Sequence, residues 1–168
     1  PDIGNLRNPR LLKALRAALV AQRVEFVNAS VEAVRPGAIG AELALSHGGR
    51  VTAPRVLIGA GAWTSTLLEP LGVDLPLFPA KGEMLLYRLP PGRVRSIVLT
   101  DEGYLIPRAD GAVLAGSTLK AGDATTYPTV TGRWALQAMA ASLLPELASV
   151  TPSYHWAGVR PGSDRDWP

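Results

Sequence analysis

The stretch that decides the fold runs from Gly82 to Thr118 and reads GEMLLYRLPPGRVRSIVLTDEGYLIPRADGAVLAGST. Its apolar segments are short, as strands are, and the tripeptides PPG, DEG and ADG between them are typical of tight turns. The strand-like segments cover residues 83–88, 96–100, 104–107 and 112–118. Because strands joined by tight turns pair with their neighbours along the chain, this block predicts an antiparallel sheet.

The flanking sequence adds helices and further strands to this sheet. Residues 131–144 predict a helix that Thr131 caps, that Pro145 bounds and that carries Trp134, Ala138, Met139 and Leu143 on one face. Nearer the N-terminus, Asn8 and Pro9 are suited to begin an amphipathic helix over residues 10–22. The remaining predicted strands cover residues 24–27, 31–34, 41–45 and 154–160, with a hairpin turn at Gly48-Gly49.

Residues 55–59 (RVLIG) form an apolar run of the kind that parallel sheets bury. The run leads into Gly59-x-Gly61 and then a short helix, capped by Thr64 or Ser65 and ending near Leu71. This spacing is typical of a dinucleotide-binding turn, but the third glycine of that fingerprint is replaced by Thr64. A tight strand-to-helix turn with no ligand is the alternative. The prolines that follow predict a crossover over residues 72–80.

Length and composition exclude several classes of protein. The chain has 168 residues, 47% of them hydrophobic and 18% charged, so it can bury a core and is not disordered overall. A net charge of +3, from 17 basic and 14 acidic side chains, is too small to indicate nucleic-acid binding. No apolar run approaches the ~18 residues of a membrane span, and zero cysteines exclude disulfides and thiolate metal sites. We therefore expect a cytoplasmic protein.

Two side chains are candidates for binding a ligand. Arg160 ends an otherwise apolar strand, where an unpaired guanidinium would be costly, so it needs either an internal carboxylate or the carboxylate of a ligand. Tyr104 lies on a predicted strand and presents its hydroxyl either to the core or to a cavity. The residues alone leave both questions open.

Other polar residues carry weaker signals. His47 and His155 are isolated in the sequence, so neither a metal site nor a catalytic triad is predicted. Asp101-Glu102 is typical of a turn. The tripeptide Lys81-Gly82-Glu83 lies at the junction of two halves of the chain, and we interpret it as a loop that could line a cleft.

Several of these segments, in order, resemble the D-amino-acid oxidase superfamily of FAD-dependent oxidoreductases, and within it the glycine oxidases. The segment VLIGAGAWT (56–64) is similar to a late strand of the flavin domain, and PAKGE (79–83) is similar to the start of the substrate domain. The motifs that continue in register are YLIPR (104–108), GST (116–118), KAGD (120–123), LPEL (144–147) and WAGVRPG (156–162).

The resemblance implies a role for three residues at the substrate. The arginine that matches Arg160 grips the substrate carboxylate, and the tyrosine that matches Tyr104 donates its hydroxyl to the same carboxylate. Leu119 matches an apolar position that lines the substrate pocket. The partner of Arg160 would then be a ligand.

The resemblance also implies FAD as cofactor. Val31 matches a backbone contact to the adenine end of FAD, whereas Ala60, Gly61 and Trp63 match the end of a strand near the cofactor. The fold expected is a mixed α+β fold, with part of a Rossmann-like FAD domain and an antiparallel substrate domain that carries one long helix. Residues 1–75 would be the C-terminal part of a split FAD-binding region, 76–162 the substrate domain, and 163–168 a link to a further FAD-binding segment.

The implied reaction is oxidative deamination of glycine or another small amino acid. A hydride passes to flavin N5, dioxygen reoxidises the flavin to give hydrogen peroxide, and the imine hydrolyses. A glycine-rich G-x-G-x-x-G segment is not found in the sequence, so we expect this chain to be the central part of a longer, homo-oligomeric enzyme and to be inactive and free of FAD by itself. The alternatives are a related sarcosine or D-amino-acid dehydrogenase and a catalytically silent folding or assembly domain.

Overall fold

The chain forms two compact units, Pro1–Arg55 and Val56–Pro168, and the computed structural model describes residues 4–165 of them. The described part holds three α-helices and two antiparallel sheets, which confirms the predicted mixed α+β fold. The functional boundary expected at residue 75 stays a prediction, as does the link over residues 163–168, of which 166–168 lie outside the described residues.

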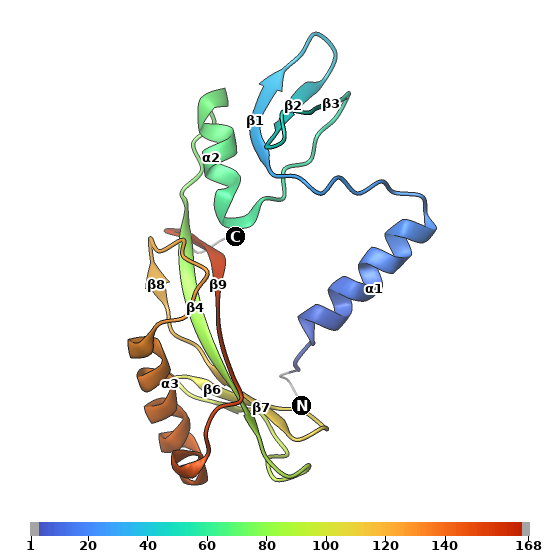
Figure 1. Ribbon diagram of the computed structural model, residues 1–168. Coiled ribbons are helices and arrows are strands. Elements are labelled where there is room, and N and C mark those ends of the chain that lie inside the picture. Colours follow the sequence, from blue (N-terminus) through green and yellow to red (C-terminus); the bar gives the residue numbers. More distant parts are fainter. Residues whose placement is uncertain (1–3, 166–168) are drawn as a thin grey trace. The chain divides into compact units, whose positions relative to one another are not determined.

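The first unit consists of one helix and a three-stranded antiparallel sheet of order β1-β2-β3 (Figure 1). Its elements are α1 (Asn8–Ala21), β1 (Val31–Pro36), β2 (Ala41–Leu45) and β3 (Arg50–Ala53). The hairpin between β2 and β3 was predicted from the turn at Gly48-Gly49. Val34 and Leu45 are the buried apolar side chains of this unit.

The first unit differs from the sequence prediction in two details. The cap of α1 is Arg7, whose side chain does not cap the helix, and Asn8 is already helical. Residues 24–27 are not a strand, because a strand needs a neighbouring strand for its backbone hydrogen bonds and this segment pairs with none of the described residues. The guanidinium carbon of Arg16 instead lies over the Phe26 ring, 4.5 Å from the ring centre.

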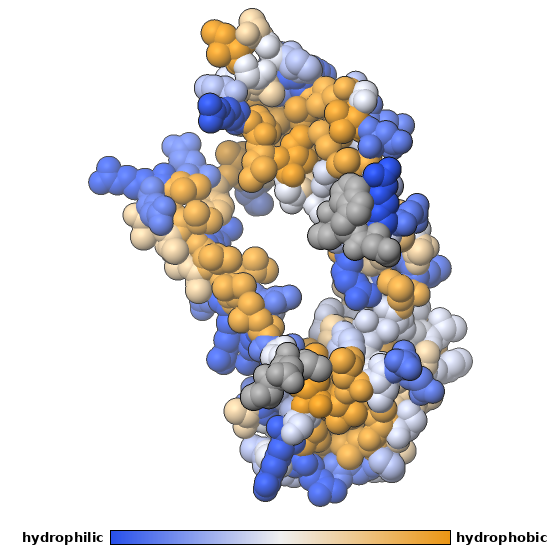
Figure 2. Space-filling model, turned by 180° about the vertical axis from the view of Figure 1, so that it is seen from behind, coloured by the Kyte–Doolittle hydropathy of each residue, from blue (hydrophilic) through white to orange (hydrophobic). Residues whose placement is uncertain are grey.

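The helix α1 carries an exposed apolar stripe, visible as orange side chains along the helix in Figure 2. The stripe consists of Leu11, Leu12, Leu15, Leu19 and Val20. None of the residues of α1 is buried. The amphipathic pattern that predicts the helix is therefore present without a described partner for its apolar side.

The second unit is organised around the long central strand β4 (Leu77–Arg88). On one edge β4 pairs with β9 (Tyr154–Ser163), and on the other edge with β7 (Ala112–Gly116) and β8 (Lys120–Ala121). Strands β6 (Tyr104–Pro107) and β5 (Val98–Leu99) extend the sheet beyond β7 (Figure 1). All pairings are antiparallel, as the turn-rich stretch from Gly82 to Thr118 predicts.

The two faces of this sheet differ in burial because side chains alternate along a strand. Odd-numbered residues of β4, such as Leu85 and Tyr87, are buried together with Leu136 and Ala140 of α3 (Val130–Leu143). Even-numbered residues of β9, such as Trp156 and Gly158, are exposed on the opposite face. The remaining core side chains are Leu105, Val113, Ala115, and Leu147 of η3 (Pro145–Ser149).

Helix α3 begins and packs slightly differently from the prediction. Its cap is Thr129, whose hydroxyl accepts a hydrogen bond from the Gly132 N–H at 3.0 Å, and not Thr131. The buried side of the helix is centred on Leu136 and Ala140, whereas Trp134 is exposed. The cap lies two residues before the predicted one, and the helix begins and ends one residue earlier than predicted. The contacts of the helix with the sheet decide which side is buried.

The segment before β4 is less regular than predicted. Residues 55–59 are not a strand, and Leu57 is 97% exposed, because no described strand runs beside this apolar run. Short helices follow: η1 (Gly61–Trp63), α2 (Thr64–Leu68), capped by neither Thr64 nor Ser65, and η2 (Glu69–Leu71). The predicted crossover over residues 72–80 ends early, since β4 begins at Leu77 and includes Pro79.

Candidate active site

The open face of the second unit holds a cavity of about 230 Å³ between β4, β6 and β9. Its lining combines apolar side chains, glycines and polar groups that lie far apart in the sequence. They include Gly82, Met84, Tyr104, Ser117, Trp156 and Arg160. The structure thus brings Arg160 and Tyr104, two of the three residues predicted at the substrate, to one cavity.

Arg160 reaches this cavity from β9, where it pairs with Ala80 of β4. Its Nη2 donates a hydrogen bond to the Thr118 carbonyl at 3.2 Å, and no carboxylate lies within ion-pair distance among residues 4–165. A Cβ on Gly82 would lie 2.6 Å from that same Nη2, so glycine makes room for the guanidinium against the sheet. Of the two partners that the sequence allowed for Arg160, the internal carboxylate is therefore not found among the described residues.

Tyr104 lies on β6, opposite Gly116 of β7. A Cβ on Gly116 would lie 3.0 Å from the Tyr104 hydroxyl, so the ring covers this glycine closely. The hydroxyl has one described contact, the Met84 sulfur at 4.0 Å, which is a weak acceptor. The phenol is thus available to donate to a stronger acceptor in the cavity.

A buried network of charged groups lies on the other face of the sheet. Lys81 and Glu83 are 2% and 4% exposed, and the Lys81 Nζ lies 3.4 Å from Glu83 Oε1. The His155 ring Nε2 lies 2.9 Å from Glu83 Oε2, and Thr129 donates its backbone N–H to Oε2 (2.9 Å) and its hydroxyl to Oε1 (2.8 Å). The interpretation of Lys81-Gly82-Glu83 as a loop was wrong, because these residues lie inside β4.

These contacts determine the ionisation of Glu83. Burial raises the pKa of the Glu83 carboxyl, but the hydrogen bonds from Thr129, Lys81 and His155 outweigh it and hold the pKa below its usual value. The network therefore holds an ionised carboxylate in the interior, and it joins β4, β9 and the first turn of α3.

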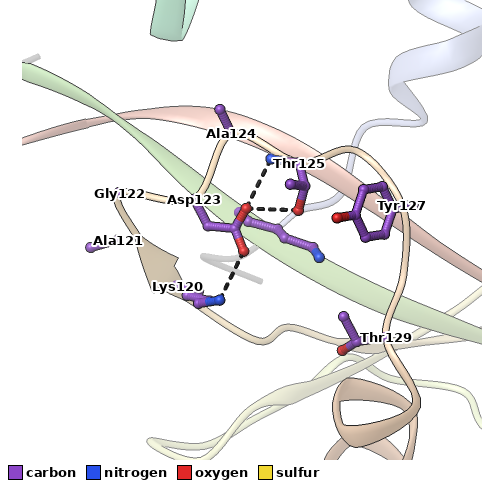
Figure 3. A pocket seen from close by; sticks show the side chains of 9 residues that line it. Lys120, Ala121, Gly122, Asp123, Ala124, Thr125, Tyr127 and Thr129 are labelled. Atoms are coloured by element: carbon purple, nitrogen blue, oxygen red, sulfur yellow. Dashed lines mark hydrogen bonds and ion pairs between the residues drawn. The ribbon is translucent and has the colours of Figure 1, made fainter.

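A second cavity, of about 550 Å³, lies beside this network, and Figure 3 shows the side chains that line it. Asp123 pairs with Lys120 at 3.1 Å and accepts hydrogen bonds from the N–H and hydroxyl of Thr125, which lower the pKa of its carboxyl. Lys81 lies 5.1 Å from the ring centre of Tyr127. Because the charged groups here are paired with each other, this cavity offers no uncompensated charge to a ligand.

The other predicted site residues do not join the cavity that contains Arg160. Leu119 is 72% exposed and is not part of the cavity lining. Ala60, Gly61 and Trp63 lie at η1, which packs against β4 and β9, with Trp63 49% exposed. Val31 lies on β1 in the first unit.

Sequence reasoning missed the glycines that shape the site and the network behind it. Gly82 and Gly116 matter because each lies under one polar side chain, Arg160 or Tyr104. The available signal was the alternation of β4, which places Lys81 and Glu83 on the face opposite Gly82. That signal becomes readable only once the segment is known to be a strand.

The comparisons with known proteins agree with this fold. Residues 1–167 match the model of the DAO family, described as FAD dependent oxidoreductase. The chain belongs to this family. It is 41% identical to a glycine oxidase of Pseudomonas aeruginosa over 99% of the chain and 46% of that protein, so it spans about half the length of this curated relative.

Two solved structures are similar in backbone arrangement as well as in sequence. The glycine oxidase of Geobacillus kaustophilus superposes with a TM-score of 0.79 at 26% identity, over 85% of this chain and 39% of that chain. The iminodiacetate oxidase of Chelativorans sp. BNC1 superposes with a TM-score of 0.78 at 28% identity, over 93% of this chain and 43% of that chain. The fold seen here is thus a part of the fold of these oxidases.

Proposed function

We propose that the whole protein is an FAD-dependent oxidase of glycine or another small amino acid, and that this chain supplies the substrate carboxylate site. The observation that carries the proposal is the convergence of Arg160 and Tyr104 on one cavity, with no carboxylate among residues 4–165 paired with the arginine. Family membership and the 41% identical glycine oxidase support the same reaction class.

In this proposal the chain's own residues bind and orient the substrate. The planar guanidinium of Arg160 donates two parallel hydrogen bonds to the substrate carboxylate, and the Tyr104 hydroxyl donates a third. Because both groups hold the carboxylate, the position of the attached α-carbon is fixed as well. The chain thus contributes to the reaction by positioning the substrate. Met84 and Trp156 line the same cavity and offer the bound α-carbon an apolar surface.

The size of the cavity supports a small substrate. A volume of about 230 Å³ is at or below the lower end of the range for small-molecule pockets, roughly 300 Å³. Met84 and Trp156 are the bulky apolar side chains that bound this space. Glycine, sarcosine and iminodiacetate are therefore the amines to test first.

The residues around η1 fit one edge of an FAD molecule. Gly61 has φ +57° and a Cβ there would meet no heavy atom within 4 Å, so the turn is open, and the half-exposed Trp63 offers a flat apolar surface. Ala60, Gly61 and Trp63 would hold this edge, and Val31 of the first unit would contact the adenine end. When bound, FAD supplies the acceptor for the substrate hydride.

The proposal is tested with the whole protein. We expect it to purify with the absorbance bands of flavin and to release hydrogen peroxide when glycine or sarcosine is added. A protein without flavin that turns over none of the small amines would be the catalytically silent alternative. Dye reduction without peroxide would favour the dehydrogenase alternative instead.

The sequence-based expectations of a homo-oligomer and of a cytoplasmic location stay predictions. No helix among residues 4–165 is long and apolar enough to cross a membrane. Gel filtration of the whole protein tests the first expectation, and fractionation of the cells that make it tests the second.

A further inference from the structure

The hydrogen-bonded ladder on one edge of β4 loses its regular register beside the candidate site. Met84 pairs with Gly116 of β7, whereas Lys81 pairs with Lys120 of β8. The two intervening residues of β4, Gly82 and Glu83, therefore face three residues, 117–119. One extra residue opposite a continuous strand is a β-bulge, and bulges beside active sites redirect backbone and side-chain groups.

Thr118 lies in the middle of this bulge and makes an unusual pair of hydrogen bonds with Glu83. Its N–H donates to the Glu83 carbonyl at 3.3 Å, as in an ordinary ladder. The N–H of Glu83, however, donates to the Thr118 hydroxyl at 2.9 Å and not to a main-chain carbonyl. The side chain thus takes the place of the main-chain acceptor.

This exchange leaves the Thr118 carbonyl free to accept another donor. The donor is Nη2 of Arg160, at 3.2 Å. A carbonyl restrains the guanidinium without neutralising it, whereas a carboxylate in the same place would satisfy its charge. The remaining N–H groups of Arg160 stay available for an anion in the cavity.

We propose that Thr118 is a positioning residue that aims Arg160 at the substrate carboxylate, an inference that rests on the proposed function. The Thr118 hydroxyl, in place of the Thr118 carbonyl, accepts the hydrogen bond from the Glu83 N–H. The carbonyl then accepts a hydrogen bond from the Arg160 guanidinium. Glu83 is a firm anchor for this arrangement, because Thr129 and His155 hold its carboxylate on the other face of the sheet.

The test compares Thr118→Val, which removes the hydroxyl at nearly constant volume, with Thr118→Ser, which keeps it. In the whole protein we expect Thr118→Val to weaken the binding of acetate, measured by calorimetry, and to raise the KM for glycine, each about tenfold. The kcat should change by less than about threefold, because a bound substrate meets the same reacting groups. Thr118→Ser should restore both values to within about twofold of the wild type.

A double-mutant cycle separates positioning from general destabilisation. In an Arg160→Ala background, Thr118→Val should add nothing further to the loss of acetate binding, since there is no guanidinium to aim. Thr52→Val, at an exposed position of β3, is the matched control and should bind acetate normally. Melting temperatures show whether Thr118→Val folds, and Thr118→Ala removes the same hydroxyl if it does not.

Two results would overturn the inference. One is acetate binding by Thr118→Val at wild-type strength, and the other is a further loss of the same size in the Arg160→Ala background. Acetate binding without turnover of any amine contradicts the proposed function alone, and the acetate series still decides the role of Thr118. A wild type that binds no acetate contradicts the positioning role as well.

Discussion

At the level of single residues, Arg160 and Tyr104 differ in how they would bind a carboxylate. The guanidinium offers a full charge and a planar pair of donors, whereas the phenol offers one hydrogen bond. Both side chains lie against glycine, Arg160 over Gly82 and Tyr104 over Gly116. The site therefore depends on the two glycines, which leave room, as well as on the two polar side chains.

Replacing these two residues should give effects of different size in the whole enzyme. We expect Arg160→Lys to raise KM steeply because the planar pair of donors is lost. Tyr104→Phe should cost about 1.5–3 kcal/mol, one hydrogen bond to a charged group. Steady-state kinetics with glycine measure both, and Arg95→Lys, at an exposed position away from the cavity lining, is the control. An unchanged KM in Arg160→Lys would mean that Arg160 is only structural.

Tyr87 provides a test of the core that is independent of function. The side chain is fully buried, and its hydroxyl has no hydrogen-bond partner among the described residues, so burial raises the pKa of the phenol. A buried donor without a partner costs roughly 1–3 kcal/mol. We expect Tyr87→Phe to leave the melting temperature unchanged or to raise it. A clear decrease would show that the hydroxyl has a partner in the whole protein.

At the level of elements, β4 connects the site with the core. Gly82 lies under Arg160 on the open face, while Lys81 and Glu83 on either side of it are buried, Glu83 against the first turn of α3. Gly132 in the first turn of α3 is part of this arrangement, since a Cβ there would lie 2.3 Å from Glu83 Oε2. On one face, β4 thus contributes to the candidate site. On the other face, its Glu83 contacts the start of α3.

The Glu83 network predicts a specific dependence of stability on pH. Because the pKa of Glu83 is lowered from 4.5 in the folded protein, its contribution is complete above about pH 4.5 and is lost as the pH falls through the folded-state pKa. We expect Glu83→Gln to lose roughly 3–5 kcal/mol of unfolding free energy at neutral pH, since Lys81 keeps a buried charge without its partner. Its unfolding free energy should also fall less steeply in acid.

Urea unfolding at neutral and acidic pH measures both effects. Glu32→Gln, an exposed substitution on β1, is the matched control and should follow the wild type. If Glu83→Gln showed the wild-type acid dependence, Glu83 would not be the titrating group.

A methyl group at Gly82 tests the packing under Arg160. The Cβ of Gly82→Ala would lie 2.6 Å from Arg160 Nη2, 3.2 Å from Cζ and 3.2 Å from the Thr118 carbonyl oxygen, so the guanidinium must move. We expect KM for glycine to rise about tenfold or more while the protein stays folded. Gly37→Ala adds the same methyl at ordinary contact distance, 3.7 Å from the nearest atom, and should bind substrate normally. Wild-type kinetics in Gly82→Ala would contradict the close packing.

The sequence predicted the elements whose signals are local. Turn tripeptides and alternation located β6 at its observed bounds and β9 to within three residues of its end. The strands expected over 24–27 and 55–59 did not form, because an apolar run becomes a strand only beside a partner. The Glu83–His155 contact joins residues 72 positions apart, so no local pattern could indicate it.

At the level of the whole molecule, the residues that the resemblance assigns to FAD are divided between the two units. Val31 belongs to the first unit, and Ala60, Gly61 and Trp63 belong to the second. The chain also spans only 46% of the Pseudomonas aeruginosa glycine oxidase. Cofactor binding is therefore expected to need more than the residues of either unit.

The partial coverage of the glycine oxidase predicts how FAD binding responds to truncation. We expect the whole protein to bind FAD and the 168-residue chain to bind it at least a hundredfold more weakly, since the chain spans only 46% of that relative. Quenching of flavin fluorescence during titration measures both affinities. Tight binding by the 168-residue chain, with turnover of glycine, would contradict this expectation.

The two faces of the second sheet also bear on how the proposed specificity could change. Residues that line the cavity and residues that maintain the fold alternate along the same strands, as Met84 and Leu85 do on β4. Substitutions at cavity positions such as Met84 and Trp156 can therefore accumulate without passing through unstable intermediates. In evolutionary terms, β4 and β9 separate selection for specificity from selection for stability, so laboratory libraries restricted to these positions should keep most variants folded.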